Sequence, residues 1–137
     1  MGKYKDPYLI EFKKLGAPDI GYISVGQNDE LPFEIRRVFW TYFTPENIVR
    51  GRHSHYRTEQ ILIAASGKIT VNTEFADGTI KTFILENPSI GLYIPPNVWH
   101  TMQYTHSSTQ VVLASTEFKE EDYIRDYEIF KQVWSEK

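Results

Sequence analysis

The sequence VRGRHSHYRTEQILIAA, residues 49–65, decides the fold. It contains two strand-like segments, Val49–His55 and Glu59–Ala65, joined by a short polar turn. Alternate residues of a strand lie on one face, so His53 and His55 project side by side, roughly 6–7 Å apart along the chain. A single buried histidine is often only a hydrogen-bonded core residue. Two on one strand face indicate a functional site built on β-structure.

Strand signals recur on both sides of this stretch. Ten segments are rich in Ile, Val, Thr and aromatic residues. They are Tyr8–Phe12, Gly21–Val25, Glu34–Phe43, Val49–His55, Glu59–Ala65, Lys68–Phe75, Thr79–Leu85, Gly91–Ile94, Val98–Tyr104 and Gln110–Ala114. Alternation is clearest in residues 69–75, and Asp77-Gly78 then predicts a hairpin to the next strand. Many short strands at this spacing predict an all-β antiparallel sandwich or small barrel.

The pattern changes after Thr116. Tyr123, Tyr127, Phe130 and Trp134 follow one another at steps of four, three and four residues, which places them on one face of a helix. The spacing therefore predicts a C-terminal α-helix over residues 119–134. Its aromatic face is expected to pack against the barrel or a dimer partner.

Composition limits the function classes. The 137 residues, 41% hydrophobic and 24% charged, predict one domain over residues 1–137. Cysteine is absent, which excludes a disulfide framework and a thiolate nucleophile and favours a cytoplasmic location. The N-terminus lacks the apolar region of a signal peptide, and no aliphatic run approaches the about 20 residues that span a membrane. A net charge of −3 argues against nucleic-acid binding.

Positive charge is concentrated in one region. Five of the six arginines lie between residues 36 and 57: Arg36, Arg37, Arg50, Arg52 and Arg57. Arginine forms planar, bidentate pairs with phosphate and carboxylate groups. The cluster indicates a small anionic ligand, although a solvated strand face with acidic neighbours is the alternative. Aromatic residues make up 15% of the chain, and some are expected to line a pocket for a flat ligand.

A second suggestive segment, GLYIPPNVWH, covers residues 91–100. With the His-x-His pair, Glu59 and Gly67, this proline turn ending in His100 resembles the two sequence boxes of the cupin superfamily. The resemblance implies a cupin-type double-stranded β-helix, or jelly roll, here with an appended C-terminal helix. The glycine that the second box has in its turn is replaced by Pro96 or Asn97.

The whole chain also resembles a narrower branch, the sugar-nucleotide 3,4-ketoisomerases that act on dTDP-4-keto-6-deoxyglucose. The motifs that carry this resemblance are PFEIRRV (32–38), RGRHSH (50–55), EQIL (59–62), GLYI (91–94), VWH (98–100) and DYIRDY (122–127). The resemblance implies an intramolecular oxidoreductase with no metal or other cofactor, in the synthesis of 3-amino-3,6-dideoxyhexoses. It also implies a homodimer that exchanges N-terminal strands.

Moving a carbonyl from C4 to C3 of a sugar requires removal of the C3 proton, an enediol-like intermediate and return of a proton at C4. Histidine suits this chemistry, because its unperturbed pKa is about 6.5. By the resemblance, His53 is the principal acid/base, His55 assists, and His100 completes the catalytic set. Arg37 and Arg50 are expected to clamp the pyrophosphate while aromatic rings stack on thymine. The further predicted substrate contacts are Arg52, Glu59, Tyr93 and Trp99.

Several positions depart from the resemblance. Phe39 and Trp40 stand where a tyrosine usually follows Arg-Val, so a hydroxyl group near the histidines is missing. Tyr56 replaces a lysine after His-x-His. His100 matches the branch that gives a galacto-configured 3-keto product, but Ile20 matches neither usual residue at the second position bearing on that choice.

Two other functions compete. His53, His55, Glu59 and His100 have the types and order of a three-histidine, one-carboxylate site, so a metal-dependent cupin enzyme is one alternative. The other is a non-catalytic module that binds a sugar nucleotide. Metal content and turnover of the keto sugar distinguish the three.

Overall fold

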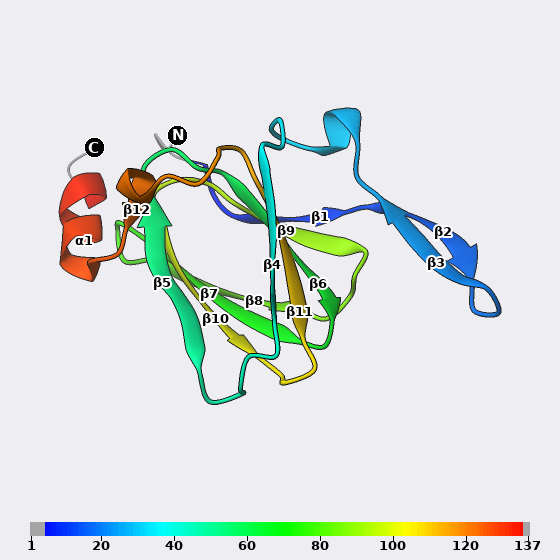
Figure 1. Ribbon diagram of the computed structural model, residues 1–137. Coiled ribbons are helices and arrows are strands. Elements are labelled where there is room, and N and C mark those ends of the chain that lie inside the picture. Colours follow the sequence, from blue (N-terminus) through cyan, green and yellow to red (C-terminus); the bar gives the residue numbers. More distant parts are fainter. Residues whose placement is uncertain (1–4, 136–137) are drawn as a thin grey trace.

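Two five-stranded sheets pack face to face in the computed structural model, which describes residues 5–135 (Figure 1). The first has the order β1-β9-β6-β11-β4. Its strands are β1 (Tyr8–Glu11), β9 (Ile90–Ile94), β6 (Gln60–Ser66), β11 (Thr109–Ala114) and β4 (Arg37–Tyr42). Every pairing in this sheet is antiparallel.

The second sheet has the order β12-β5-β10-β7-β8 and is also antiparallel. Its strands are β12 (Tyr123–Ile124), β5 (Val49–His55), β10 (Val98–Tyr104), β7 (Ile69–Phe75) and β8 (Ile80–Leu85). From β4 to β12 successive strands alternate between the sheets, except for the β7–β8 hairpin, so the chain winds around a common interior. The predicted all-β jelly roll is confirmed, and so is the hairpin, where Gly78 adopts a φ of +92° in the turn between β7 and β8.

The interior divides into an apolar part and a polar part. Aliphatic side chains from both sheets, including Leu62, Ile69, Val71, Leu92 and Ile94, form the main buried cluster. Polar side chains of β5, β10 and the adjoining strands lie toward one end of this interior, where the functional site is found. A smaller cluster of Phe12, Ile61 and Tyr93 covers the opposite face of the first sheet.

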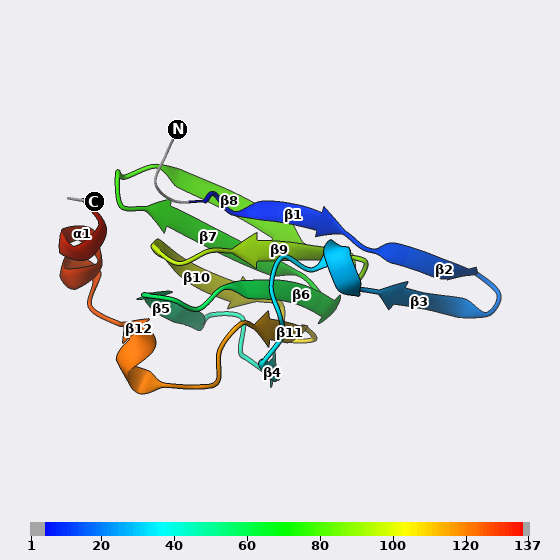
Figure 2. The ribbon, with the colours of Figure 1, turned by 90° about the horizontal axis from the view of Figure 1, so that it is seen from above.

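A two-stranded hairpin projects from the barrel (Figure 2). It consists of β2 (Lys13–Ala17) and β3 (Gly21–Val25), and the 3-10 turn η1 (Asn28–Glu30) follows it. The sequence predicted β3 but missed β2, because a Lys-Lys-Leu-Gly segment lacks apolar alternation. This hairpin makes its own hydrogen-bond ladder away from the barrel core.

The C-terminal segment corrects the predicted helix. Residues 120–122 form the 3-10 turn η2 (Glu120–Asp122), Tyr123 and Ile124 form β12, and the helix α1 spans Tyr127–Ser135. The helix is therefore confirmed only in its second half, where Tyr127 and Phe130 pack against Trp99. The side chain of Trp134 lies outside the described residues. Over residues 5–135, no helix is long and apolar enough to cross a membrane.

Candidate active site

A β-bulge in β5 positions the two histidines of the His-x-His pair. His53 lies opposite His100 of β10, but the next paired residue is Gly51 opposite Thr101, so Arg52 is the extra residue. Gly51 and Arg52 both adopt positive φ angles, +88° and +60°. A Cβ atom on Gly51 would lie 2.9 Å from the His100 carbonyl oxygen, which explains the glycine.

Three histidines meet in the barrel. The ring centroid of His53 lies 5.0 Å from that of His55 and 4.7 Å from that of His100. One nitrogen from each ring lies within 4.8 Å of the others. His55 and His100 are almost fully buried, with exposed fractions of 2% and 1%. The predicted pairing of His53 with His55, and the convergence of His100 on them, are therefore present in the structure.

Backbone carbonyl groups fix the tautomers of two of these rings. Nδ1 of His53 lies 3.1 Å from the Gly51 carbonyl oxygen, and Nδ1 of His100 lies 3.2 Å from that of Val98. A carbonyl oxygen only accepts, so Nδ1 of each neutral ring carries the proton and donates it. Nε2 is then an unprotonated nitrogen, which is the form that a general base requires.

Burial keeps the three rings uncharged at neutral pH. Desolvation is the main cause, and it lowers the pKa of His53 to about 3 and that of His100 to about 4. The pKa of His55 falls to about 2 for the same reason, with the charge of neighbouring His100 as the next cause. The site thus holds neutral imidazoles that can accept a proton.

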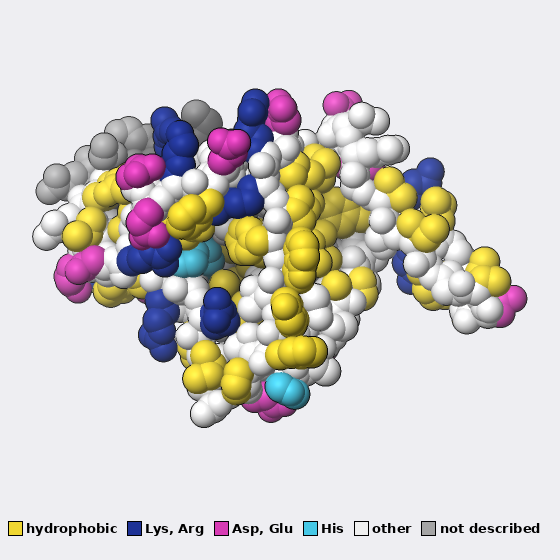
Figure 3. All heavy atoms as spheres, in the orientation of Figure 1, with side chains coloured by type: hydrophobic (Ala, Val, Ile, Leu, Met, Phe, Trp, Pro, Cys, Tyr) yellow, Lys and Arg dark blue, Asp and Glu magenta, His cyan; other side chains and the backbone are white. Residues whose placement is uncertain are grey.

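A cavity of about 200 Å³ opens beside these rings. Its wall includes His53, His100, Arg50, Tyr123 and Arg125. In the space-filling view, a histidine lies in a hollow between Lys and Arg side chains (Figure 3). Pockets for drug-sized ligands measure roughly 300–1,000 Å³, so this cavity suits a single sugar ring and leaves a larger ligand to extend over the mouth.

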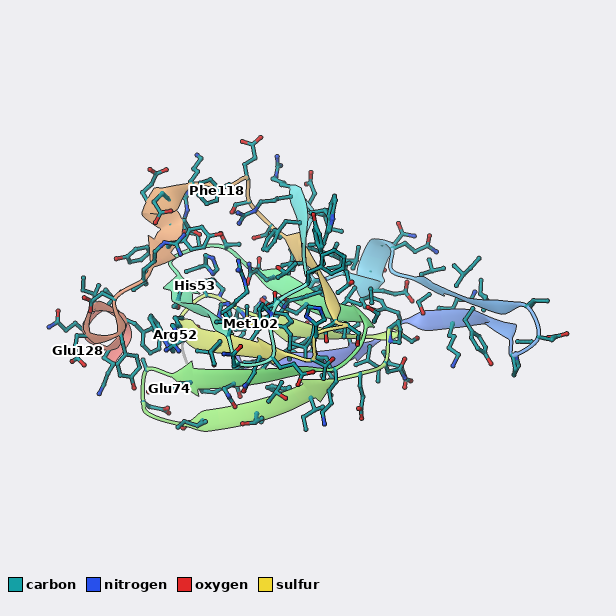
Figure 4. The ribbon with its side chains drawn as sticks, turned by 60° about the horizontal axis from the view of Figure 1, so that its bottom comes forward. Arg52, His53, Glu74, Met102, Phe118 and Glu128 are labelled. Atoms are coloured by element: carbon teal, nitrogen blue, oxygen red, sulfur yellow. The ribbon has the colours of Figure 1, made fainter. Side chains whose placement is uncertain are left out.

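Tyr123 is the main site residue that the sequence analysis did not assign. Its ring centroid lies 4.5 Å from that of His55 and 5.2 Å from that of His53. Arg37 donates a hydrogen bond of 3.2 Å to its hydroxyl oxygen, and Arg125 lies over its ring. Figure 4 labels His53, which lines the cavity, and Phe118, whose ring packs on Tyr123.

Asp122 anchors Tyr123 in this position. Its carboxylate accepts hydrogen bonds from the backbone N–H groups of Arg57 and Thr58 and from the Thr58 hydroxyl. Tyr123 then pairs with His55 at the free edge of β5. The available signal was the motif DYIRDY (122–127), already noted above, which contains both Asp122 and Tyr123.

Buried glutamines form another part of the wall that was missed. Gln60 and Gln110 line the cavity, and both are almost completely buried. The Gln110 amide oxygen accepts a hydrogen bond from the Tyr104 hydroxyl, while its nitrogen has no partner within the structure. A glutamine at the start of each of two apolar strands was the signal available in the sequence.

Of the six predicted substrate contacts only Arg50 lines the cavity; Arg37 lies beside it, hydrogen-bonded to Tyr123, and the other four lie elsewhere. Adjacent strand residues point to opposite faces, so Trp99, next to His100, lies under α1, and Tyr93 lies in the cluster behind the first sheet. Arg52 is exposed at the bulge. Glu59 accepts a hydrogen bond from the Tyr93 hydroxyl and lies 4.0 Å from Lys5 Nζ.

The position of Glu59 also bears on the metal alternative. Among the described residues, His53, His55 and His100 form the group with metal-ligand geometry, and Glu59 is not part of it. The proposed tetrad is therefore not assembled. The neighbouring strand residue Gln60 faces the cavity instead and offers a neutral amide where that site needs a carboxylate.

Comparison with known proteins assigns this arrangement to a family. A family model described as FdtA, WxcM-like, C-terminal, matches residues 5–135. The chain belongs to this family. A TDP-4-oxo-6-deoxy-alpha-D-glucose-3,4-oxoisomerase of Aneurinibacillus thermoaerophilus is 36% identical over 126 residues, which cover 90% of this chain and 89% of that protein.

Solved structures of the same kind confirm that this family member is an isomerase with a cupin-type fold. The sugar 3,4-ketoisomerase QdtA from Thermoanaerobacterium thermosaccharolyticum, in complex with TDP, is 34% identical, with a TM-score of 0.89 and 95% coverage of both chains. A histidine-to-asparagine variant of QdtA, in complex with TDP-4-keto-6-deoxyglucose, is 32% identical, with a TM-score of 0.90 and coverage of 96% and 95%.

Proposed function

We propose that this enzyme converts dTDP-4-keto-6-deoxyglucose into a dTDP-3-keto-6-deoxyhexose. The observation that carries the proposal is the unprotonated Nε2 of His53 at a cavity that fits one sugar ring. The relatives support the substrate, because one is a TDP-4-oxo-6-deoxyglucose 3,4-oxoisomerase and QdtA has been seen with TDP and with the keto sugar. We assign no step to a metal ion or another cofactor.

The residues at the cavity and directly behind its wall divide into a proton-transfer group and a binding group. His53 takes the C3 proton, and buried His55 and His100 hold its ring in an uncharged setting. Arg50 at the cavity wall binds the pyrophosphate. Arg37 contributes a second positive charge beside Tyr123. We propose no substrate contact for Arg52, Glu59, Tyr93 or Trp99.

Incubation with dTDP-4-keto-6-deoxyglucose in deuterated water tests the function directly. Because the C3 proton passes to a histidine that exchanges with solvent, the 3-keto product is expected to carry deuterium at C4, detected by NMR. The H4–H5 coupling constant of product made in ordinary water reports the C4 configuration, which we propose to be galacto on the basis of His100. Tight nucleotide binding with neither product nor deuterium incorporation would contradict catalysis. Stoichiometric metal in untagged protein would instead favour the metal-dependent alternative.

We propose that the active form is a homodimer that exchanges N-terminal strands. Two apolar surfaces support this assembly: the outer face of β4, with Trp40 60% exposed, and the projecting hairpin, with Ile20 79% exposed. Light scattering of the full chain is expected to give twice its mass of 16.0 kDa. A monomer at micromolar concentration would overturn the assembly without affecting the reaction. The cytoplasmic location stays a prediction.

A further inference from the structure

The Tyr123 hydroxyl group has a free proton at the cavity. Arg37 is a donor in its hydrogen bond with this hydroxyl, because guanidinium nitrogens carry protons and do not accept. The bond occupies a lone pair of the phenol oxygen and leaves its proton available. Over residues 5–135, no acceptor for that proton is present. Tyr123 also lines the cavity, so its proton can be donated to a bound ligand.

Other groups at the cavity are poor proton donors to an oxygen of the sugar. The three histidines are neutral, because burial lowers their pKa values well below 7. Tyr104, the other phenol in the wall, already donates to the Gln110 amide oxygen. Phe39 has no hydroxyl to offer. Tyr123 is thus the acidic group best placed beside the base.

We propose that Tyr123 is a catalytic residue that carries a proton between the two sugar oxygens, a role that rests on the proposed ketoisomerase function. His53 takes the C3 proton, and the C3–H electron pair forms the C3=C4 bond. The carbonyl π electrons move to O4, which takes the Tyr123 proton and gives an enediol. The Tyr123 phenolate then takes the proton from O3, and the O3–H electron pair forms the C3=O bond. The π electrons of the C3=C4 bond take the proton of His53 at C4.

Both side chains return to their starting states in this sequence, and no co-reactant is needed. Arg37 supports the intermediate state, because its guanidinium donates to the oxygen that becomes a phenolate. Its Nε and Nη2 atoms are buried and have no partner in the described structure. The charge of this buried guanidinium group stabilises the negative charge that develops on the Tyr123 oxygen. Arg37 is thereby a positioning residue for Tyr123.

The variant Tyr123→Phe removes the hydroxyl and keeps the ring. It is expected to lower kcat for dTDP-4-keto-6-deoxyglucose about 10²-fold or more, with KM and the Kd for TDP within about twofold. Tyr127→Phe is the matched control: it makes the same change in a tyrosine whose hydroxyl bonds Glu74 outside the cavity, and it should keep wild-type activity. Turnover of Tyr123→Phe within threefold of wild type would overturn the proposal.

A second measurement covers the case in which Tyr123→Phe does not fold. Incorporation of 3-fluorotyrosine at residue 123 keeps ring and hydroxyl but makes the phenol more acidic. The groups facing it are Arg37, Arg125, His53 and His55. The alkaline limb of the kcat/KM profile is expected to move to lower pH, and an unchanged profile would count against the relay. Absence of turnover in the wild type would instead refute the proposed function.

Discussion

Replacement of His53 by asparagine is expected to lower kcat about 10³-fold while leaving the affinity for TDP unchanged. Asparagine is polar but cannot take a proton at neutral pH, so it removes the base without emptying the cavity wall. His53 is also the member of the histidine pair that lines the cavity, whereas His55 lies behind it. Product formation by NMR and TDP binding by calorimetry give the two quantities.

Arg50→Ala provides the contrast for this experiment. A hydrogen bond between charged groups contributes about 1.5–3 kcal/mol, so loss of Arg50 should weaken TDP binding by roughly tenfold or more and leave the chemical step intact at saturating substrate. The two variants then separate proton transfer from binding. Equal loss of TDP affinity in both would contradict the assigned roles.

Acid is expected to destabilise the fold through the buried histidines. Burial lowers their folded-state pKa values to between about 2 and 4, whereas an unfolded histidine has a pKa near 6.5. The unfolded chain therefore binds more protons below pH 6.5, and stability falls as the pH falls from there toward the folded-state values. Between pH 7.5 and pH 5, His55 alone should lower the free energy of unfolding by about 2 kcal/mol.

Urea unfolding of His55→Gln at both pH values measures this contribution. The variant should lose about 2 kcal/mol less than the wild type between pH 7.5 and pH 5, since it has no proton to bind at that position. His106→Gln is the matched control, because His106 is exposed in the loop before β11 and its replacement should leave the pH dependence unchanged. Identical pH dependence in His55→Gln and wild type would exclude His55 as a cause of the acid destabilisation.

The sequence was most informative where local pattern and tertiary structure agree. Residues 49–55 and 98–104 were predicted as strands with the bounds that β5 and β10 have in the structure. Both are flanked by turns, and both carry a histidine on the inner face. Alternation alone also predicted that His53 and His55 share a face. It could not predict that His100 lies directly opposite His53, since strand register depends on long-range pairing.

The helix prediction failed where hydrogen bonds to a distant part of the chain determine the conformation of a segment. The aromatic spacing assigned Tyr123 to a helix, but the Asp122 carboxylate binds backbone donors of residues 57 and 58 and holds the following residues extended against β5.

The inner and outer faces of a buried strand are also difficult to separate by composition. Tyr93 and Trp99 were therefore grouped with the site, although both point away from the cavity.

The extra residue in β5 determines which changes in chain length the site tolerates. Gly51 and Arg52 together oppose Thr101, so Arg50 and His53 reach the same cavity although they are three positions apart in the sequence. Removal of one residue at Gly51–Arg52 would restore plain alternation and leave both side chains on the inner face. Removal of Ser54 would instead make the two histidines direct neighbours on opposite faces of the strand. A single-codon deletion in this strand is therefore tolerated at the bulge, whereas one residue further on it separates the two histidines in one step.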